Sequence, residues 1–202
     1  MKIIVIGATG TIGKAVADQL ALRHDVIRAS RKSETQVDIR DYASVAALFD
    51  RIKNVDAVVS CGGDVEALQK SVMGPLEKLS DEQFQFGFRM VLDQINLVRS
   101  GMKFLRDGGS ITLTTGAIST HPRPGSTVAS MLGASIESFI RSASLETPRG
   151  LRINAVSPGW VKETMEKFGM DSTSGMPAKT LADFYALAVE GNMNGQIIEP
   201  TV

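Results

Sequence analysis

The segment KIIVIGATGTIG, residues 2–13, decides the fold predicted for this chain. Its first residues, Lys2 to Ile6, form a short β-branched apolar run, which is typical of a buried strand. Apolar residues at helical spacing follow from residue 14 to residue 22, so Gly7, Gly10 and Gly13 lie where a strand turns into a helix. Glycines in this context permit a tight turn, the approach of a pyrophosphate to the backbone, and close helix–sheet packing.

This glycine turn is therefore a predicted nucleotide site. The N-terminus of the following helix offers unpaired N–H groups and a partial positive charge to phosphates. A tight structural turn without a ligand is the alternative. The residues expected to contact the nucleotide here are Gly7, Thr9, Gly10, Thr11, Ile12 and Gly13.

Strand and helix patterns alternate along the rest of the chain. This alternation predicts an α/β fold: a doubly wound parallel sheet with helices on both faces, three layers in all, with ligand loops at the carboxyl ends of the strands. We expect residues 1–202 to form one domain. Further strands are expected over 25–29, 36–39, 56–60, 110–114, 151–156 and 195–199. Helices are expected over 41–52, 80–105, 128–145 and 181–189. A capping box is expected at Ser80–Gln83 and a turn at 107–109.

The composition excludes several classes of protein. Twenty-two Lys and Arg residues balance twenty-two Asp and Glu residues, so there is no basic field to hold nucleic acid. The single cysteine, Cys61, excludes an intramolecular disulfide framework and a cysteine metal cluster. The apolar stretches are too short for a membrane span, so we expect a soluble cytoplasmic protein with no metal, nucleic-acid or membrane partner.

The end of the second predicted strand indicates which dinucleotide is bound. An acidic residue at this place binds the ribose 2′-hydroxyl of NAD, but this chain has Ser30, Arg31 and Lys32 there, with no carboxylate before Glu34. Ser30 can donate a hydrogen bond, and the Arg31 guanidinium can pair with a 2′-phosphate. This favours NADP(H) over NAD(H), the alternative being that Arg31 and Lys32 are a solvated surface pair.

These motifs make the sequence similar to the short-chain dehydrogenase/reductase family over nearly its whole length. Besides GATGTIG, the segments that carry the resemblance are Val37-Asp38-Ile39, Ser60-Cys61-Gly62-Gly63 and PRGLRINAVSPG over 148–159. The resemblance implies a Rossmann fold. In it, Asp38 and Ile39 contact the adenine, and Cys61 and Gly62 lie at the fourth-strand motif. Pro158 and Gly159 border the nicotinamide, and Thr164 binds the nicotinamide carboxamide.

The resemblance fails at the residues that carry the family's chemistry. The family uses a tyrosine made acidic by a lysine four residues later, and these positions fall on Val128 and Leu132. The chain has only two tyrosines, Tyr42 and Tyr185, and no lysine between residues 103 and 162. The family's serine position falls on Thr115 or Gly116, and its helical asparagine position falls near Val91. The chain thus resembles a small subset of short members that keep the glycine loop and lack the active-site residues.

Two residues are weak catalytic candidates. His121 follows the fifth strand, and because histidine is the residue type best suited to proton exchange near neutral pH, it could replace the phenol with Arg123 as an oxyanion partner; a solvated loop histidine is the alternative. Thr115 is expected to hydrogen bond to substrate or ribose, because no base is evident beside it in the sequence.

The sequence leaves two functions open. One is an NADP(H)-binding oxidoreductase with a departed active site, acting on a small molecule that the sequence does not identify. The other is a non-catalytic nucleotide-binding sensor or scaffold protein. The resemblance also implies a homodimer or homotetramer, formed through the helix expected over 128–145, whose small residues would otherwise serve internal packing only.

Overall fold

A computed structural model describes residues 1–62 and 72–201 of the chain. Its centre is a seven-stranded sheet with the strand order β3-β2-β1-β4-β5-β6-β7, and every recorded strand pair is parallel. The chain order reverses between β1 and β4, which is where doubly wound sheets form a crevice at their carboxyl edge. This confirms the predicted fold class. The strands are β1 (Lys2–Ile6), β2 (Asp25–Ser30), β3 (Thr35–Gln36), β4 (Val55–Ser60), β5 (Leu105–Thr114), β6 (Arg152–Val156) and β7 (Ile197–Ile198).

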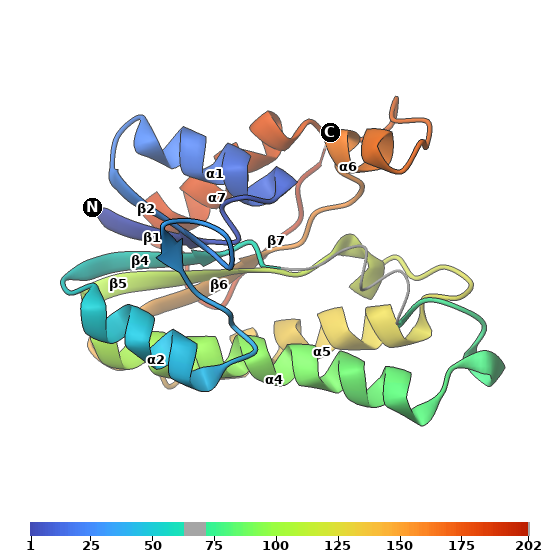
Figure 1. Ribbon diagram of the computed structural model, residues 1–202, viewed down its shortest axis with the longest axis horizontal. Helices are drawn as coiled ribbons and strands as arrows, with labels where there is room; N and C mark the ends of the chain where they lie inside the picture. Colours follow the sequence, from blue (N-terminus) through green and yellow to red (C-terminus); the bar gives the residue numbers. More distant parts are fainter. Residues whose placement is uncertain (63–71, 202) are drawn as a thin grey trace.

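Helices cover both faces of the sheet (Figure 1). The side chains of β1 alternate between the two resulting cores: Ile4 and Ile6 pack on the side of α2, α4 and α5, while Ile3 and Val5 pack on the side of α1 and α7. The apolar runs in the sequence reflect burial on both faces. The α-helices are α1 (Thr11–Ala21), α2 (Tyr42–Arg51), α4 (Asp81–Phe104), α5 (Thr127–Ala143), α6 (Lys162–Lys167) and α7 (Ala178–Glu190), with short 3-10 turns η1 (Leu76–Lys78) and η2 (Ala117–Ser119).

The predicted helix starts are confirmed where the sequence has a capping residue. Ser80 accepts a hydrogen bond from the Gln83 amide, the Gln83 side chain accepts one from Ser80, and the capping box starts α4. The Asp41 carboxylate likewise accepts the Ala43 amide at the start of α2.

Three predictions about the strands need correction. The strand expected over 36–39 ends at Gln36, because Asp38 instead forms a turn in which its carbonyl accepts the Asp41 amide. The turn expected over 107–109 lies inside β5 as an irregularity: Leu105 pairs with Val55 and Ser110 with Ala57, and Gly108 has a φ of 74°. The last strand, expected over 195–199, is confined to β7.

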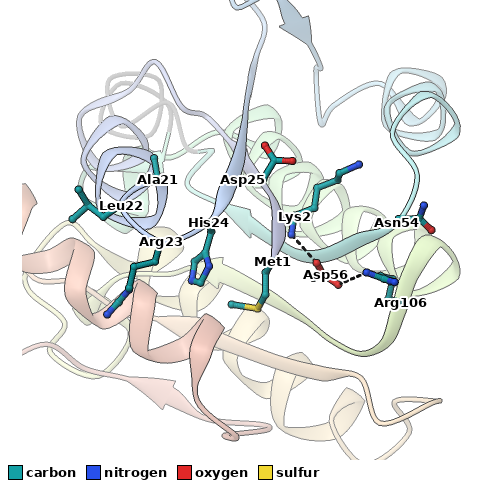
Figure 2. A pocket seen from close by; sticks show the side chains of 10 residues that line it. All are labelled: Met1, Lys2, Ala21, Leu22, Arg23, His24, Asp25, Asn54, Asp56 and Arg106. Atoms are coloured by element: carbon teal, nitrogen blue, oxygen red, sulfur yellow. Dashed lines mark hydrogen bonds and ion pairs between the residues drawn. The ribbon is translucent and has the colours of Figure 1, made fainter.

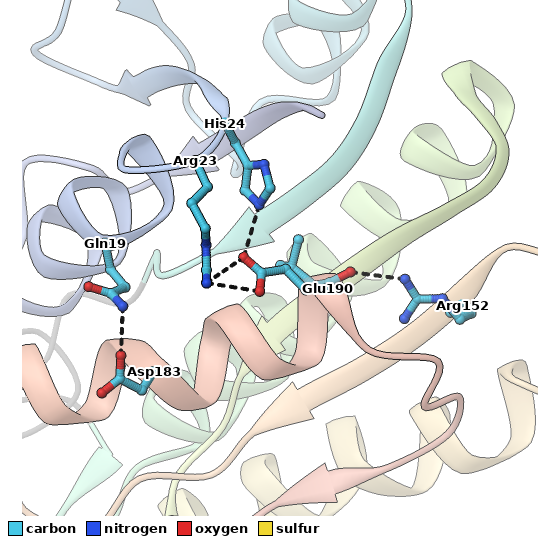
Figure 3. Close-up of polar contacts among 7 residues, drawn as sticks. Gln19, Arg23, His24, Arg152, Asp183 and Glu190 are labelled. Carbon is cyan, nitrogen blue, oxygen red and sulfur yellow. Dashed lines mark hydrogen bonds and ion pairs between the residues drawn. The ribbon is translucent and has the colours of Figure 1, made fainter.

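The face formed by α1 and α7 is held by polar pairs from α1 and the residues that follow it to α7 (Figure 3). Arg23 donates two hydrogen bonds to the Glu190 carboxylate, at 2.8 and 2.9 Å, and His24 Nε2 lies 2.9 Å from the same group. Gln19 donates to Asp183 at 2.7 Å. From the sheet, Arg152 donates to the carbonyls of Ala188 and Val189 at the end of α7, so part of the sixth-strand motif is structural.

Two findings concern what the described part of the chain does not contain. None of its helices combines the length and apolarity that a membrane crossing requires. Within the same residues, no group of three or more His, Cys, Asp or Glu side chains is arranged to hold a metal ion.

Candidate functional site

The glycine turn after β1 forms a cradle that a side chain would fill. A Cβ atom on Gly13 would lie 2.1 Å from the Gly7 carbonyl oxygen, and Gly7 itself has a φ of 81° with only 2.9 Å from its Cβ position to the Cys61 backbone. Gly10 is exposed, and a Cβ there would approach Gly7 to 3.3 Å. Thr9 is also exposed, and Thr11 and Ile12 open α1, whose N-cap residue makes no side-chain hydrogen bond. The first turn of α1 therefore presents its amides at this edge.

At the end of β2, Ser30 shapes the predicted ribose contact. Its buried hydroxyl oxygen accepts hydrogen bonds from the Lys32 amide at 3.1 Å and the Ser33 amide at 2.9 Å. The turn that results presents Arg31 and Lys32 at the exposed rim of the sheet. The carbonyl of neighbouring Ala29 accepts the Gly7 amide, so this turn adjoins the glycine cradle.

After β3, a carboxylate and a guanidinium meet that the sequence did not pair. Arg40 donates to Asp38 through Nε at 2.9 Å and through Nη2 at 2.5 Å, and Arg31 adds a favourable charge nearby. Arg40 is the main cause that holds the pKa of Asp38 below its usual value. The Ile39 side chain lies 3.4 Å from the Cβ position of Gly62, so the predicted adenine residues do converge on the end of β4.

The end of β4 is fixed by a buried amide on α4. Gln94 donates to the Gly62 carbonyl at 3.1 Å, and the Ser60 hydroxyl donates to Gln94 Oε1 at 3.1 Å. Sequence counting placed the helical amide position near Val91, whereas the amide that holds the end of β4 is Gln94, three residues further on. Gly63 lies outside the described residues.

Cys61 and Tyr185 share the other face of the same strand ends. The Tyr185 hydroxyl lies 2.7 Å from Thr114 Oγ1, which donates to the Ser60 carbonyl at 2.7 Å. Burial raises the pKa of the Cys61 thiol to about 12 and raises that of Tyr185 well above its usual value. Tyr185 is fully buried, and its pKa is shifted in the opposite direction from that of a catalytic phenol.

The ends of β5 and β6 meet beside the predicted nicotinamide turn. Thr115 follows β5 directly, and its amide donates to the carbonyl of Val156, the last residue of β6. The Ala117 amide donates to the Pro158 carbonyl at 2.9 Å, which brings Gly116 and the Pro158-Gly159 turn together. Strand alternation directs Thr115 to the α5 side of the sheet, with Leu113.

On that side, Thr115 meets a buried carboxylate. The Ser119 hydroxyl donates to Glu137 Oε1 at 2.5 Å, and Thr115 Oγ1 donates to the same oxygen at 3.4 Å. Glu137 is 3% exposed and lies on α5. The sequence analysis found no base beside Thr115 because Glu137 is twenty-two residues away along the chain.

The two positions counted for the family's tyrosine and lysine lie in the core. Val128 and Leu132 are 0% and 5% exposed and pack against Gly87 of α4, where a Cβ would meet Leu132 at 3.0 Å. The face of α5 that borders η2 instead carries Gly133 and Glu137, and the Cβ position of Gly133 lies 3.1 Å from Ser119.

The remaining predicted residues lie around this end of the edge. His121 is exposed, and its Nδ1 lies 3.0 Å from Thr120 Oγ1. The guanidinium of Arg123, the expected oxyanion partner, lies over the Trp160 ring, 5.0 Å from the centroid. Thr164 is half-buried in α6, and the preceding Glu163 carboxylate accepts the Ala178 amide at 2.9 and 3.1 Å, which caps α7.

Asp93 of α4 is a further buried carboxyl that the sequence did not single out. It is 2% exposed, and its Oδ1 atom has no hydrogen-bond partner among the described residues. Arg89 Nε lies 3.7 Å from that oxygen, but burial is the larger influence and raises the pKa of Asp93. Asp93 lies near Asp38 and Arg40 and so borders the predicted adenine end.

A polar hollow at the opposite edge of the sheet does not belong to this site (Figure 2). It is lined by the amino ends of β1 and β2 and by Asp56 and Arg106. Asp56 accepts the Lys2 amide at 2.6 Å and Arg106 Nη1 at 3.4 Å, so the polar groups at its floor satisfy one another.

Comparison with known proteins places the chain in a family. The doubly wound sheet and the glycine-lined turn at its switch point define a Rossmann-type α/β protein. The sequence model described as "Enoyl-(Acyl carrier protein) reductase" matches residues 7–183. The chain belongs to the short-chain dehydrogenase/reductase family, which is a family of oxidoreductases.

Individual relatives agree with this assignment. The chain is 34% identical to the protein lin1944 from Listeria innocua, with a TM-score of 0.90 and 100% of both chains covered. It is 26% identical to a small-chain dehydrogenase solved in complex with NADPH, with a TM-score of 0.84 and coverage of 99% and 96% of the two chains.

Two curated relatives are longer than this chain. "Glucose and ribitol dehydrogenase homolog 2" from Arabidopsis thaliana is 22% identical over 95% of this chain and 72% of its own length. "Oxidoreductase UcpA" from Escherichia coli K12 is 26% identical over 77% of this chain and 61% of its own length.

Proposed function

We propose that this chain is an NADP(H)-binding oxidoreductase whose active site departs from the tyrosine–lysine pair of its family. The glycine cradle carries the proposal, because Gly7 and Gly13 leave no room for side chains between the end of β1 and α1, and Gly10 at the exposed rim leaves the backbone uncovered. A backbone this close to the edge, with an uncapped helix N-terminus behind it, is suited to a pyrophosphate. NADPH in the similar small-chain dehydrogenase supports the same ligand class.

The site residues are proposed in the roles that the fold allows. The backbone from Thr9 to Ile12 would hold the pyrophosphate. Ser30 and Arg31 would bind the phosphate on the adenine ribose. Pro158-Gly159 would border the nicotinamide end of the dinucleotide. Asp38 and Ile39, together with Cys61 and Gly62, would border the adenine. Thr164 would bind the carboxamide of the nicotinamide. When bound, NADP(H) supplies or accepts the hydride, while Thr115 offers a hydroxyl to a substrate oxygen. We propose that residues 1–202 form one nucleotide-binding domain, since one sheet includes strands from Lys2 to Ile198. We further propose that the protein is cytoplasmic.

The choice of NADP(H) over NAD(H) rests on the turn at the end of β2. Arg31 stands where an acidic residue would bind a 2′-hydroxyl, and a guanidinium pairs well with a phosphate. Titration calorimetry should show NADPH binding at least about tenfold tighter than NADH, a difference of about 1.4 kcal/mol. Arg31→Gln should remove this preference, whereas Arg51→Gln at the distant end of α2 should keep it. Equal affinities in the unaltered protein would contradict the assignment.

One observation favours the second candidate function, a non-catalytic sensor or scaffold. Val128 and Leu132, at the positions counted for the phenol and ammonium, are apolar and buried. A panel of aldehydes, ketones and quinones distinguishes the two functions: NADPH oxidation with any of them supports the oxidoreductase. Tight NADPH binding without turnover across the panel would favour the sensor.

We further propose a homodimer or homotetramer formed through α4 and α5. Phe86, Phe88 and Leu92 of α4 are 39%, 47% and 51% exposed, although residues of this type are usually covered. Phe88→Arg with Leu92→Arg should lower the mass measured by light scattering. Leu145→Arg, at an 87% exposed residue beyond α5, is the matched control.

A further inference from the structure

Glu137 is a buried acid whose surroundings point to a function. Its carboxylate lies on the face of α5 that borders η2 and accepts hydrogen bonds from the hydroxyls of Ser119 and Thr115. Arg141 is the nearest recorded cation, at 3.7 Å from Oε2, and its own side chain is 58% exposed. Glu137 is therefore held mainly by two hydroxyl groups.

Packing alone does not explain this acid. Burying a carboxylate is costly unless hydrogen bonds replace its water, and an apolar residue would cover η2 without that cost. The Ser119 hydroxyl has a single proton, and the Gly116 carbonyl at 3.0 Å is an alternative acceptor for it, so η2 can close without Glu137. The carboxylate thus adds a proton acceptor to the end of β5.

The position of Thr115 gives that proton acceptor a route to the site. Thr115 lies directly between the ends of β5 and β6, one residue from the Gly116 that borders Pro158-Gly159. Its hydroxyl is half-buried, and a hydroxyl that donates to a carboxylate keeps its lone pairs for a donor on the other side. Such a donor would be the O–H of an alcohol substrate.

We propose that Glu137, acting through the Thr115 hydroxyl, holds and moves the proton exchanged with the substrate oxygen, in place of the tyrosine–lysine pair. The inference rests on the proposed oxidoreductase function. In alcohol oxidation, the substrate O–H proton passes to Thr115 Oγ1 as the Thr115 proton passes to Glu137. The alcohol carbon is oxidised to a carbonyl by loss of a hydride to NADP⁺, which is reduced, and Glu137 then releases its proton to water. Carbonyl reduction runs the same steps in reverse.

Glu137 is in this scheme a positioning residue, and Thr115 is the group that touches substrate. The polar groups recorded against the Glu137 carboxylate within the described residues are Thr115, Ser119 and Arg141, with none recorded from α4 or β6. Hydrogen bonds in catalytic sites are often long before ligands bind, which fits the 3.4 Å contact of Thr115.

The first test compares variants that keep shape and remove proton transfer. Glu137→Gln still accepts a hydrogen bond from Ser119, so unfolding and NADPH affinity should match the unaltered protein. Its kcat with the best carbonyl of the panel should fall by about 10²–10⁴-fold at unchanged KM. Thr115→Val should lose as much, Thr115→Ser should retain activity, and the double variant should be no slower than Thr115→Val. Glu146→Gln, at an exposed acid just beyond α5, is the control.

The second test does not depend on turnover. In protein labelled with ¹³C at the glutamate carboxyls, the signal absent from Glu137→Gln identifies Glu137. The ¹³C chemical shift of this signal should change when NADP⁺ binds, because the oxidised nicotinamide is positively charged, and should stay in place with 2′,5′-ADP, which lacks that ring.

The outcomes separate the two proposals. Full kcat in Glu137→Gln, or a Glu137 signal that ignores NADP⁺ when NADP⁺ is bound, overturns the inference and leaves the proposed function standing. Failure of the unaltered protein to bind NADP(H) at all overturns the proposed function itself. If Glu137→Gln does not fold, Glu137→Leu takes its place, since an apolar side chain covers η2 without a buried carboxylate; full kcat in that variant overturns the inference.

Discussion

The two halves of the sheet's carboxyl edge are built differently. At the ends of β1 and β4, the surfaces proposed to face a nucleotide are mostly glycine and backbone, as in Gly7, Gly13 and Gly62. At the ends of β5 and β6, side chains dominate, and Glu137 with Thr115 forms a polar cluster there. Backbone recognition of a phosphate tolerates few substitutions, whereas side-chain chemistry can be rebuilt on an unchanged fold. The four predictions below test this contrast, from the largest expected effect to the smallest.

The glycine half should lose both stability and NADPH binding when the contact between Gly13 and Gly7 is disturbed. Gly13→Ala places a Cβ 2.1 Å from the Gly7 oxygen, so we expect a loss of about 3 kcal/mol in the free energy of unfolding and loss of NADPH binding. Urea unfolding followed by circular dichroism measures the first effect. Gly10→Ala is the matched control, since its Cβ would be 3.3 Å from the same oxygen. It should fold normally and lose only NADPH affinity; equal stability of the two variants would contradict the cradle.

The stability of the strand ends on the α1 and α7 side of the sheet should depend on Tyr185. Tyr185→Phe removes the 2.7 Å contact with Thr114 and should cost about 1 kcal/mol, while Tyr42→Phe, at a 46% exposed residue, should cost nothing. Because burial raises the folded-state pKa of Tyr185, the stability from its neutral phenol is complete below the unfolded value of about 10 and declines as pH rises above it. Denaturation series at increasing pH should therefore show a steeper alkaline loss in the unaltered protein than in Tyr185→Phe.

The β6 half should rely on Glu163 for structure rather than for ligand contact. Its carboxylate caps α7 through the Ala178 amide, so Glu163→Ala should lower the free energy of unfolding by about 1 kcal/mol. Glu166→Ala, at an exposed acid on the same helix, is expected to change it by a few tenths. Thermal unfolding compares the two, and an equal response would show that the cap contributes nothing.

Cys61 should behave as a small buried side chain. Since burial raises the pKa of its thiol to about 12, almost none is thiolate at pH 8 and alkylation by iodoacetamide should be slow. Unfolding in urea should make the labelling fast. Rapid labelling of the folded protein, followed by mass spectrometry, would place Cys61 among reactive thiols instead.

The sequence predicted the fold well because its signals are local. The apolar run of β1, the Ser80 capping box and the glycine turn each depend on neighbouring residues, and the structure confirms each as an element. Predictions were less accurate at β3 and β7, where two-residue pairings leave little periodicity to detect.

The end of the edge at β5 and β6 was less predictable because its contacts join distant parts of the chain. Glu137 reaches Ser119 and Thr115 across eighteen and twenty-two residues, and a glutamate in an amphipathic helix gives no sign of being buried. Arg40 lies only two residues from Asp38, but two opposite charges at this spacing are common on a surface and give no signal of a ligand site. The contacts of His121 with Thr120 and of Arg123 with Trp160 were not predicted from the sequence.

The central claim is that one dinucleotide spans both halves of this edge, and a ¹⁵N amide titration tests it most directly. NADP⁺ should shift the amide signals of Gly10 and Thr11 at one half and of Thr115, Gly116 and Gly159 at the other. The truncated ligand 2′,5′-ADP should shift only the first set. Identical shifts from the two ligands, or unmoved signals at Gly10 and Thr11, would contradict the account.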